Sequence, residues 1–136
     1  MDRVFDVVTT SLMNDTSVTD IVGSRISMGH IATLSEPQFP LVTLEFEVRG
    51  DVLVPGAVVR PPIQISSWSL RSFTEAAKIL RLIEKNFIDN MPIQNDDLNI
   101  TLSVLGTPTF AAFSEGESEP RSYSGIQSYD LSVCFK

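Results

Sequence analysis

Histidine and cysteine, two side chains that often do chemistry in proteins, each occur once in this sequence, at His30 and Cys134. A nucleophilic triad needs a nucleophile, a base and an orienting group, and His30 would have to act as the base from a predicted loop. No GxSxG, GxGxxG or Walker A motif accompanies it. We therefore interpret His30 as a loop or core histidine and Cys134 as a small side chain of a strand, and we expect a protein that is not an enzyme.

Two pairs of carboxylates are the remaining candidates for acid–base chemistry. Glu45 and Glu47 alternate along a predicted strand, so their side chains share one face about 7 Å apart. A glycosidase can use such a pair, but a solvated strand face is the commoner meaning of the pattern. Asp96 and Asp97 are interpreted as loop polarity before a strand. Because no Cys/His ligand set exists either, the sequence predicts no metal and no cofactor.

The composition limits the class of protein. The 136 residues suffice for one domain, 1–136, and 43% of them are hydrophobic. Asp and Glu number 17 against 10 Lys and Arg, a net charge of −7 that argues against binding nucleic acid through its phosphates. One cysteine excludes an intrachain disulfide. The uncharged stretches are too short to span a membrane and the charged N-terminus is not that of a signal peptide, so we expect a soluble protein of a reducing compartment.

Helical periodicity marks two segments near the N-terminus. Apolar side chains recur on one face of the first segment, which predicts a helix over about 3–13. A second, short helix is expected at 17–22. Thr16 would cap it and Gly23 would end it.

The longest predicted helix covers about 72–89. It begins with a capping box in which Ser72 caps the helix and Glu75 reaches back to the cap. Its predicted buried face consists of Phe73, Ala76, Ala77, Leu80, Ile83 and Phe87.

Alternating hydrophobicity predicts the strands of a sheet, most clearly at 41–48. There we expect a buried face of Leu44, Phe46 and Val48 and a solvated face of Thr43, Glu45 and Glu47. The other predicted strands are 25–28, 63–68, 98–105, 109–113 and 123–135, with a bulge or bend at Gly106 and Pro108. The expected fold class is α+β, an antiparallel or mixed sheet of about four to six strands packed by the long helix and the N-terminal helix, with a long C-terminal hairpin.

Two segments and one tryptophan have more than one interpretation. The apolar, Pro- and Gly-containing segment 52–62 is either a hairpin crossing the core or an exposed arm whose valines pack on a neighbouring subunit. The acidic segment 114–119 serves either solubility or a charged projection that repels DNA or meets a basic partner. Trp68 is expected to be a buried anchor between a strand and the long helix, since only Arg71 is near enough to support base stacking. The candidate interface residues are Val52, Leu53, Val54, Val58, Val59, Glu115, Glu117 and Glu119.

The order of these pieces is similar to that in a known family. The matching stretches are VGSRI at 22–26, PQFPLV at 37–42, and SWS at 67–69 leading into a helix with EAA at 75–77. This series resembles the tail completion proteins of long-tailed bacteriophages, also called tail terminators or tail-to-head joining proteins. The resemblance covers about residues 4–90 and, loosely, the final hairpin. Segments 52–59 and 114–119 depart from it.

The resemblance implies a virion structural protein without catalytic activity. Its copies would form a ring, a homohexamer, that caps the phage tail tube and contributes to the head–tail neck. Its partners would be itself, the tail tube protein, the head–neck connector proteins and, as a further candidate, the sheath. DNA would pass through the lumen without sequence recognition, and no membrane would be involved. The protein would reside in the tail or neck of the virion, and in the host cytoplasm during assembly.

Such a ring closes through a heterologous interface, so each subunit must present two different patches. We expect segments 51–61 and 114–120 to reach across to the neighbour. Two alternatives remain open: another neck component, such as a head-completion connector or stopper, and a non-viral α+β interaction module.

Overall fold

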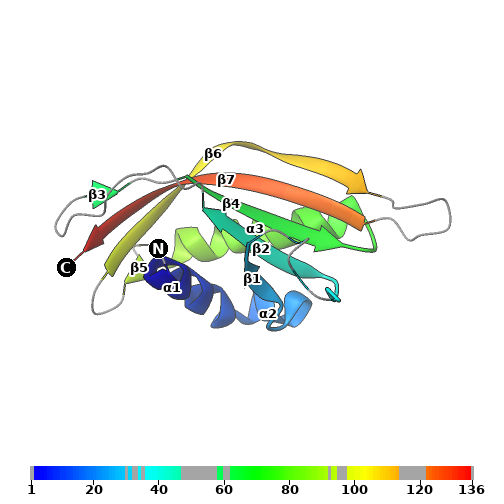
Figure 1. The fold of residues 1–136 in the computed structure, drawn as a ribbon, viewed down its shortest axis with the longest axis horizontal. Coiled ribbons are helices and arrows are strands. Elements are labelled where there is room, and N and C mark those ends of the chain that lie inside the picture. The colour runs from blue at the N-terminus through cyan, green and yellow to red at the C-terminus, as the bar shows by residue number, and fades with distance from the viewer. Residues whose placement is uncertain are drawn as a thin grey trace.

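A single mixed sheet lies over three helices in the computed structural model of the chain (Figure 1). The structure describes residues 2–29, 31, 34, 36–46, 58–59, 62–91, 93–94, 98–113 and 122–135. The helices are α1 (Asp2–Met13), α2 (Thr16–Val22) and α3 (Phe73–Asp89). The strands are β1 (Ile26–Met28), β2 (Leu41–Phe46), β3 (Val58–Val59), β4 (Pro62–Ser69), β5 (Ile93–Gln94), β6 (Leu98–Phe113) and β7 (Ser122–Phe135).

The strand order is β1-β2-β4-β7-β6-β5, and β3 pairs with β7 beyond the end of β4. β1 runs parallel to β2, and all other pairings are antiparallel. The predicted α+β class, with a mixed sheet and a long C-terminal hairpin, is therefore confirmed. β6 and β7 are the longest strands and arch over α3 (Figure 1).

One hydrophobic core fills the space between the sheet and the helices. It joins apolar side chains from α1, α2 and α3 to the sheet face that covers them, which we call the inner face; the opposite one is the outer face. The largest fully buried side chains include Leu12, Leu44, Ile63, Ile65, Ile79, Ile83, Phe87, Leu98, Ile100, Tyr129 and Leu131. Each such side chain contributes roughly 1.5–3 kcal/mol by its removal from water.

The cap of α2 differs from the prediction. Asp15, rather than Thr16, is the N-cap, and its carboxylate accepts a hydrogen bond from the Ser17 amide at 2.9 Å. Thr16 is already the first helical residue, so its hydroxyl is not placed to cap. Gly23 ends the helix as predicted, with φ +59, a conformation that glycine adopts without steric cost.

The predicted capping box of α3 is half right. Ser72 is the N-cap and its hydroxyl accepts from the Glu75 amide at 3.1 Å. The Glu75 carboxylate does not return to Ser72. It accepts instead from the Ser69 hydroxyl at 2.8 Å, and that same oxygen of Ser69 accepts from the amides of Arg71 and Ser72. The last residue of β4 therefore takes the place of the reciprocal cap.

The buried face of α3 is rotated slightly from the predicted one. Its buried residues are Ala76, Ile79, Leu80, Ile83, Asn86 and Phe87. Phe73 is 41% exposed, because its ring packs at the margin of the sheet against Phe110 and Tyr123 rather than in the core. Asn86 is buried because it bridges helices: it accepts from the Ser11 hydroxyl at 3.0 Å and donates to the Asp15 carboxylate at 3.0 Å.

The expected solvated face of β2 is wrong at Thr43. This residue is buried, and its hydroxyl accepts a hydrogen bond from the Trp68 indole at 3.1 Å. Trp68 covers that part of the outer face, which explains how both faces of β2 are buried there. Trp68 itself is buried, in agreement with its predicted role as an anchor. Val48 and Glu47 lie outside the described residues.

Candidate assembly surface

The outer edge of β6 is the longest stretch of open sheet edge in the described part of the chain. β6 pairs with β7 from Leu98 to Phe113. On its other side β5 covers only Asn99 and Ile100. From Thr101 onward, no described strand pairs with this edge. One of its backbone amides, that of Leu102, donates to the Met91 sulfur at 3.4 Å.

A bulge divides this edge into two segments. The pairing with β7 shifts between Leu105 and Thr109, and Gly106 has φ +67. The Gln127 amide, buried beneath the bulge, donates to the carbonyls of Leu105 at 3.1 Å and Gly106 at 3.5 Å. The bulge that the sequence predicts at Gly106 and Pro108 is therefore confirmed, and a buried side chain fixes it.

Aromatic rings lie on both faces of the sheet beyond the bulge, where residues 109–113 of β6 pair with residues 122–126 of β7. Phe110 lies directly opposite Gly125, on the inner face, where a Cβ on the glycine would come within 2.8 Å of both Phe110 and Leu80. Phe73 joins it, with ring centroids 6.1 Å from Phe110 and 4.9 Å from Tyr123. On the outer face, Phe113 packs against Trp68 at 5.9 Å. Such pairs contribute about 0.5–1.5 kcal/mol beyond the burial of their area.

β6 carries no charged side chain along its sixteen residues. Its exposed apolar residues are Val104, Leu105, Phe110 and Phe113, each 40–50% exposed. Natural proteins usually guard an open edge with charge, and lysine above all. Apart from the bulge and Pro108, this edge lacks such protection, which is typical of a strand that is covered in the working assembly.

Arg81 is the charged residue of α3 that lies beside this edge. Lys78, Lys85 and Asp89 of α3 are also exposed, but Lys78 lines a different groove, beside α2. Arg81 lines a shallow hollow of about 440 Å³ together with Phe73, Thr74, Ala77 and Phe110.

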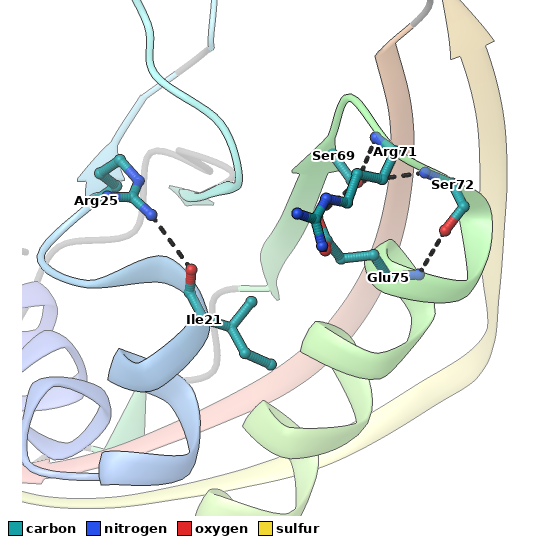
Figure 2. A network of polar contacts seen from close by, with 6 residues as sticks. All are labelled: Ile21, Arg25, Ser69, Arg71, Ser72 and Glu75. Carbon is teal, nitrogen blue, oxygen red and sulfur yellow. Dashed lines mark hydrogen bonds and ion pairs between the residues drawn. The ribbon is translucent and has the colours of Figure 1, made fainter.

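A second, larger groove of about 660 Å³ lies between α2, residues 39–40 and the start of α3 (Figure 2). On one side of it, Arg25 donates to the carbonyls of Pro40 at 2.8 Å and Ile21 at 3.2 Å, and so ties the end of α2 to the entry of β2. On the other side stands the network of Ser69, Arg71 and Glu75. Because two acidic and two basic side chains line the groove, its charge is balanced.

The predicted interface residues are only partly described. Val58 and Val59 form β3, opposite Cys134 and Val133 of β7. Cys134 is thus a strand residue, which pairs with Val58 of β3 on one side and with Asn99 of β6 on the other. Val52, Leu53, Val54, Glu115, Glu117 and Glu119 lie outside the described residues, as do His30, Asp96 and Asp97. Periodicity predicts the strands of the hairpin but does not single out the open edge of β6, although the absence of charged residues from 98 to 113 is visible in the sequence.

Within the ranges given above, no three His, Cys, Asp or Glu side chains gather as a metal site. Burial, with a smaller contribution from Glu84, raises the pKa of Tyr129 well above its usual range, so the phenol stays protonated. Among the helices formed by described residues, none is long and apolar enough to cross a membrane.

The comparisons with known proteins give similarity among solved structures. No family model and no curated protein matches this chain. Among solved structures, a chain from the "Virion of native gene transfer agent (GTA) particle" is similar, with a TM-score of 0.62 and 13% sequence identity. The match covers 93% of this chain and 91% of that one. At this identity the similarity shows a shared fold over nearly the whole of both chains.

Proposed function

We propose that this protein is a structural component of a phage-like virion, and that it acts as the tail completion ring at the head–tail neck. The observation that carries the proposal is the fold similarity to a chain of a gene transfer agent virion across 93% of the sequence. The tail completion motifs of the sequence point to the same class of particle independently.

The residues of those motifs have packing roles, which supports a protein that acts by shape. Gly23 ends α2, and Arg25 ties α2 to the start of β2. Trp68 bonds Thr43 and packs on Phe113. None of the three holds a reacting group. The described residues therefore suggest a scaffold rather than an enzyme.

In the proposed assembly, six copies form a closed ring on the last ring of the tail tube. The ring ends tube growth and offers its other surface to the connector proteins of the head. DNA passes through the lumen without specific contacts, in keeping with the net charge of −7. Val52, Leu53, Val54, Val58, Val59, Glu115, Glu117 and Glu119 remain candidates for contact with neighbouring subunits or partners.

Deletion of the gene, followed by electron microscopy of the particles, tests the proposal. We expect DNA-filled heads and unjoined tails, and complementation by the wild-type chain should restore complete particles. Complete particles in the deletion strain would contradict the neck role. In complemented particles, label on an epitope-tagged chain should lie at the upper end of the tail tube. Label on the head-side ring alone would identify a connector or stopper instead.

A further inference from the structure

The bulge changes the register between β6 and β7 by two residues. Leu105 pairs with Ser128, and the next pair is Thr109 with Ile126. Over this step β6 advances four positions and β7 only two. The distal segment of β6, residues 109–113, is therefore paired two residues out of register with the part before the bulge. Because side chains alternate between the two faces of a strand, a displacement of two leaves every inner-face residue inside and every outer-face residue outside.

The hydrophobic pattern therefore permits a second register, in which β6 would pair with β7 without a bulge. In that register Phe110 would lie opposite Tyr123 instead of Gly125, still on the inner face. Phe113, which is half exposed, would move two positions along β7, away from Trp68, which it now contacts. The choice between the two registers thus decides where the exposed rings of β6 stand.

Pro108 does not exclude the second register. The Leu102 amide donates to the Met91 sulfur, away from β7, and the direction of the backbone groups alternates along a strand. Without a bulge, Pro108 would direct its backbone outward as Leu102 does, where a missing N–H removes no bond to β7. The bulged register is therefore selected by something other than this proline or the alternation of faces.

The side chain of Gln127 distinguishes the two registers. It is 4% exposed, and its amide nitrogen donates to the carbonyls of Leu105 at 3.1 Å and Gly106 at 3.5 Å, both in the bulge. A third bond, to the Ser128 carbonyl at 3.1 Å, lies within β7 and is available in either register. In a regular ladder the carbonyls lie in the plane of the sheet, out of reach of a side chain that points away from it. The continuous register would therefore deprive a buried donor of its acceptors in β6, which costs free energy.

We propose that Gln127 sets the register of the β6–β7 hairpin, because its buried amide selects the bulged pairing over a continuous one that the hydrophobic pattern also permits. A buried asparagine fixes the register of a coiled coil in a comparable way. The packing of Phe110 on Gly125 adds a second preference for the bulged register, since a Cβ on the glycine would come within 2.8 Å of the ring.

A two-residue deletion tests whether the role of Gln127 depends on the bulge. Removal of Gly106 and Thr107 would join Leu105 to Pro108 and bring both parts of β6 into one register, with their pairs to β7 retained. Gln127 would then lack its partners in β6. We expect Gln127→Leu to lower the midpoint of urea unfolding of the full chain and to raise that of the deletion chain. Gln127→Met, which is close in size, should act in the same two directions.

The matched control is Gln64→Leu, at a half-buried glutamine on the outer face of β4. It should shift the midpoints of both chains in the same direction. If Gln127→Leu also shifts both midpoints in one direction, its side chain acts only by filling space and the proposal is wrong. A deletion chain that does not fold would contradict the proposal as well, because the continuous register would then not be accessible.

Disulfide bridges report the register directly. In a Cys134→Ser background, Ala111→Cys is combined either with Ser124→Cys, opposite it in the bulged register, or with Ser122→Cys, opposite it in the continuous one. Directly opposite residues have Cα atoms about 5.5 Å apart, within reach of a disulfide, whereas diagonal neighbours are about 7–8 Å apart. The bridges formed on oxidation are identified by mass spectrometry of the digested chain.

These chains also carry Phe110→Ala, which removes the preference of the ring for Gly125. With Gln127 present, we expect the bridge between positions 111 and 124 and none between 111 and 122. With Gln127→Leu, we expect the bridge between 111 and 122 to form as well. Its absence in that variant, or its formation while Gln127 is present, would overturn the proposal. Both experiments use the purified chain, so their results do not depend on the proposed function.

Discussion

A single hydroxyl, that of Ser69, joins the end of β4 to the start of α3. It donates to the Glu75 carboxylate and accepts from the amides of Arg71 and Ser72 (Figure 2). The ion pair of Arg71 with Glu75, at 3.8 Å and with Arg71 mostly exposed, adds little to this. The SWS stretch therefore makes a precise junction: Ser67 bonds the Ala76 carbonyl at 2.8 Å, Trp68 covers the outer face, and Ser69 sets the direction of the helix.

The burial and ionisation of the Tyr129 hydroxyl give a prediction about stability and pH. Its hydroxyl is buried without a hydrogen-bond partner among the described residues. Above pH 10, the ordinary pKa of tyrosine, the unfolded chain loses this proton while the folded chain keeps it, so stability falls as pH rises. We expect Tyr129→Phe to raise stability at pH 7 by up to about 1 kcal/mol, because it removes an unsatisfied polar group. It should also reduce the loss of stability at alkaline pH, as measured by thermal unfolding at neutral and alkaline pH.

Tyr123→Phe is the matched variant on the same strand, because Tyr123 is only partly buried. It should keep the alkaline behaviour of the wild type. If the stability of Tyr129→Phe falls at alkaline pH as much as that of the wild type, the loss is not caused by the raised pKa of Tyr129.

At the scale of the elements, the long hairpin of β6 and β7 shows both what the sequence predicts about the fold and what it does not. Its strands, its bulge and the long helix beneath it all follow from periodicity and from the positions of Gly and Pro. The inward turn of Phe110 does not, because it depends on the lack of a side chain at Gly125, fifteen residues away in sequence but directly opposite in the sheet. Likewise, Thr43 of β2 is buried next to Trp68 of the neighbouring strand β4, whose indole donates to the Thr43 hydroxyl. The open edge of β6 depends on which strand takes the last place in the sheet, and local pattern does not encode that order.

Two glycine substitutions separate steric from backbone effects in this hairpin. A Cβ at Gly125 would approach Leu80 and Phe110 to 2.8 Å, so Gly125→Ala should cost about 1–3 kcal/mol. Gly106 has open space around it but a φ of +67, so Gly106→Ala should cost about 1 kcal/mol through the backbone alone. Urea unfolding measures both.

The cost at Gly125 should fall when Phe110 is first replaced by alanine, and the cost at Gly106 should not. If Gly125→Ala lowers the free energy of unfolding equally with phenylalanine and with alanine at position 110, the Phe110 ring does not pack on Gly125.

At the scale of the whole molecule, charge is unevenly divided. The chain has a net charge of −7, yet three of the four exposed charged side chains of α3 are basic. We expect the purified chain not to bind duplex DNA at physiological salt, because three lysines and arginines on one helix face neutralise few phosphates. Fluorescence anisotropy of a labelled duplex measures this over a range of salt concentrations. Micromolar binding that weakens steeply with salt would contradict a passive lumen and point to a DNA-contacting role.

The position of β7 in the strand order has a consequence for biogenesis. β7 lies between β4 and β6 and also pairs with β3, so among the described strands residues 122–135 are what joins the two parts of the sheet. A ribosome must release this stretch before the sheet can close, and until then β4 exposes an unpaired, apolar flank. Closure of the sheet therefore waits for the last of its described strands to emerge, and until then the growing polypeptide depends on chaperones or on speed to avoid aggregation.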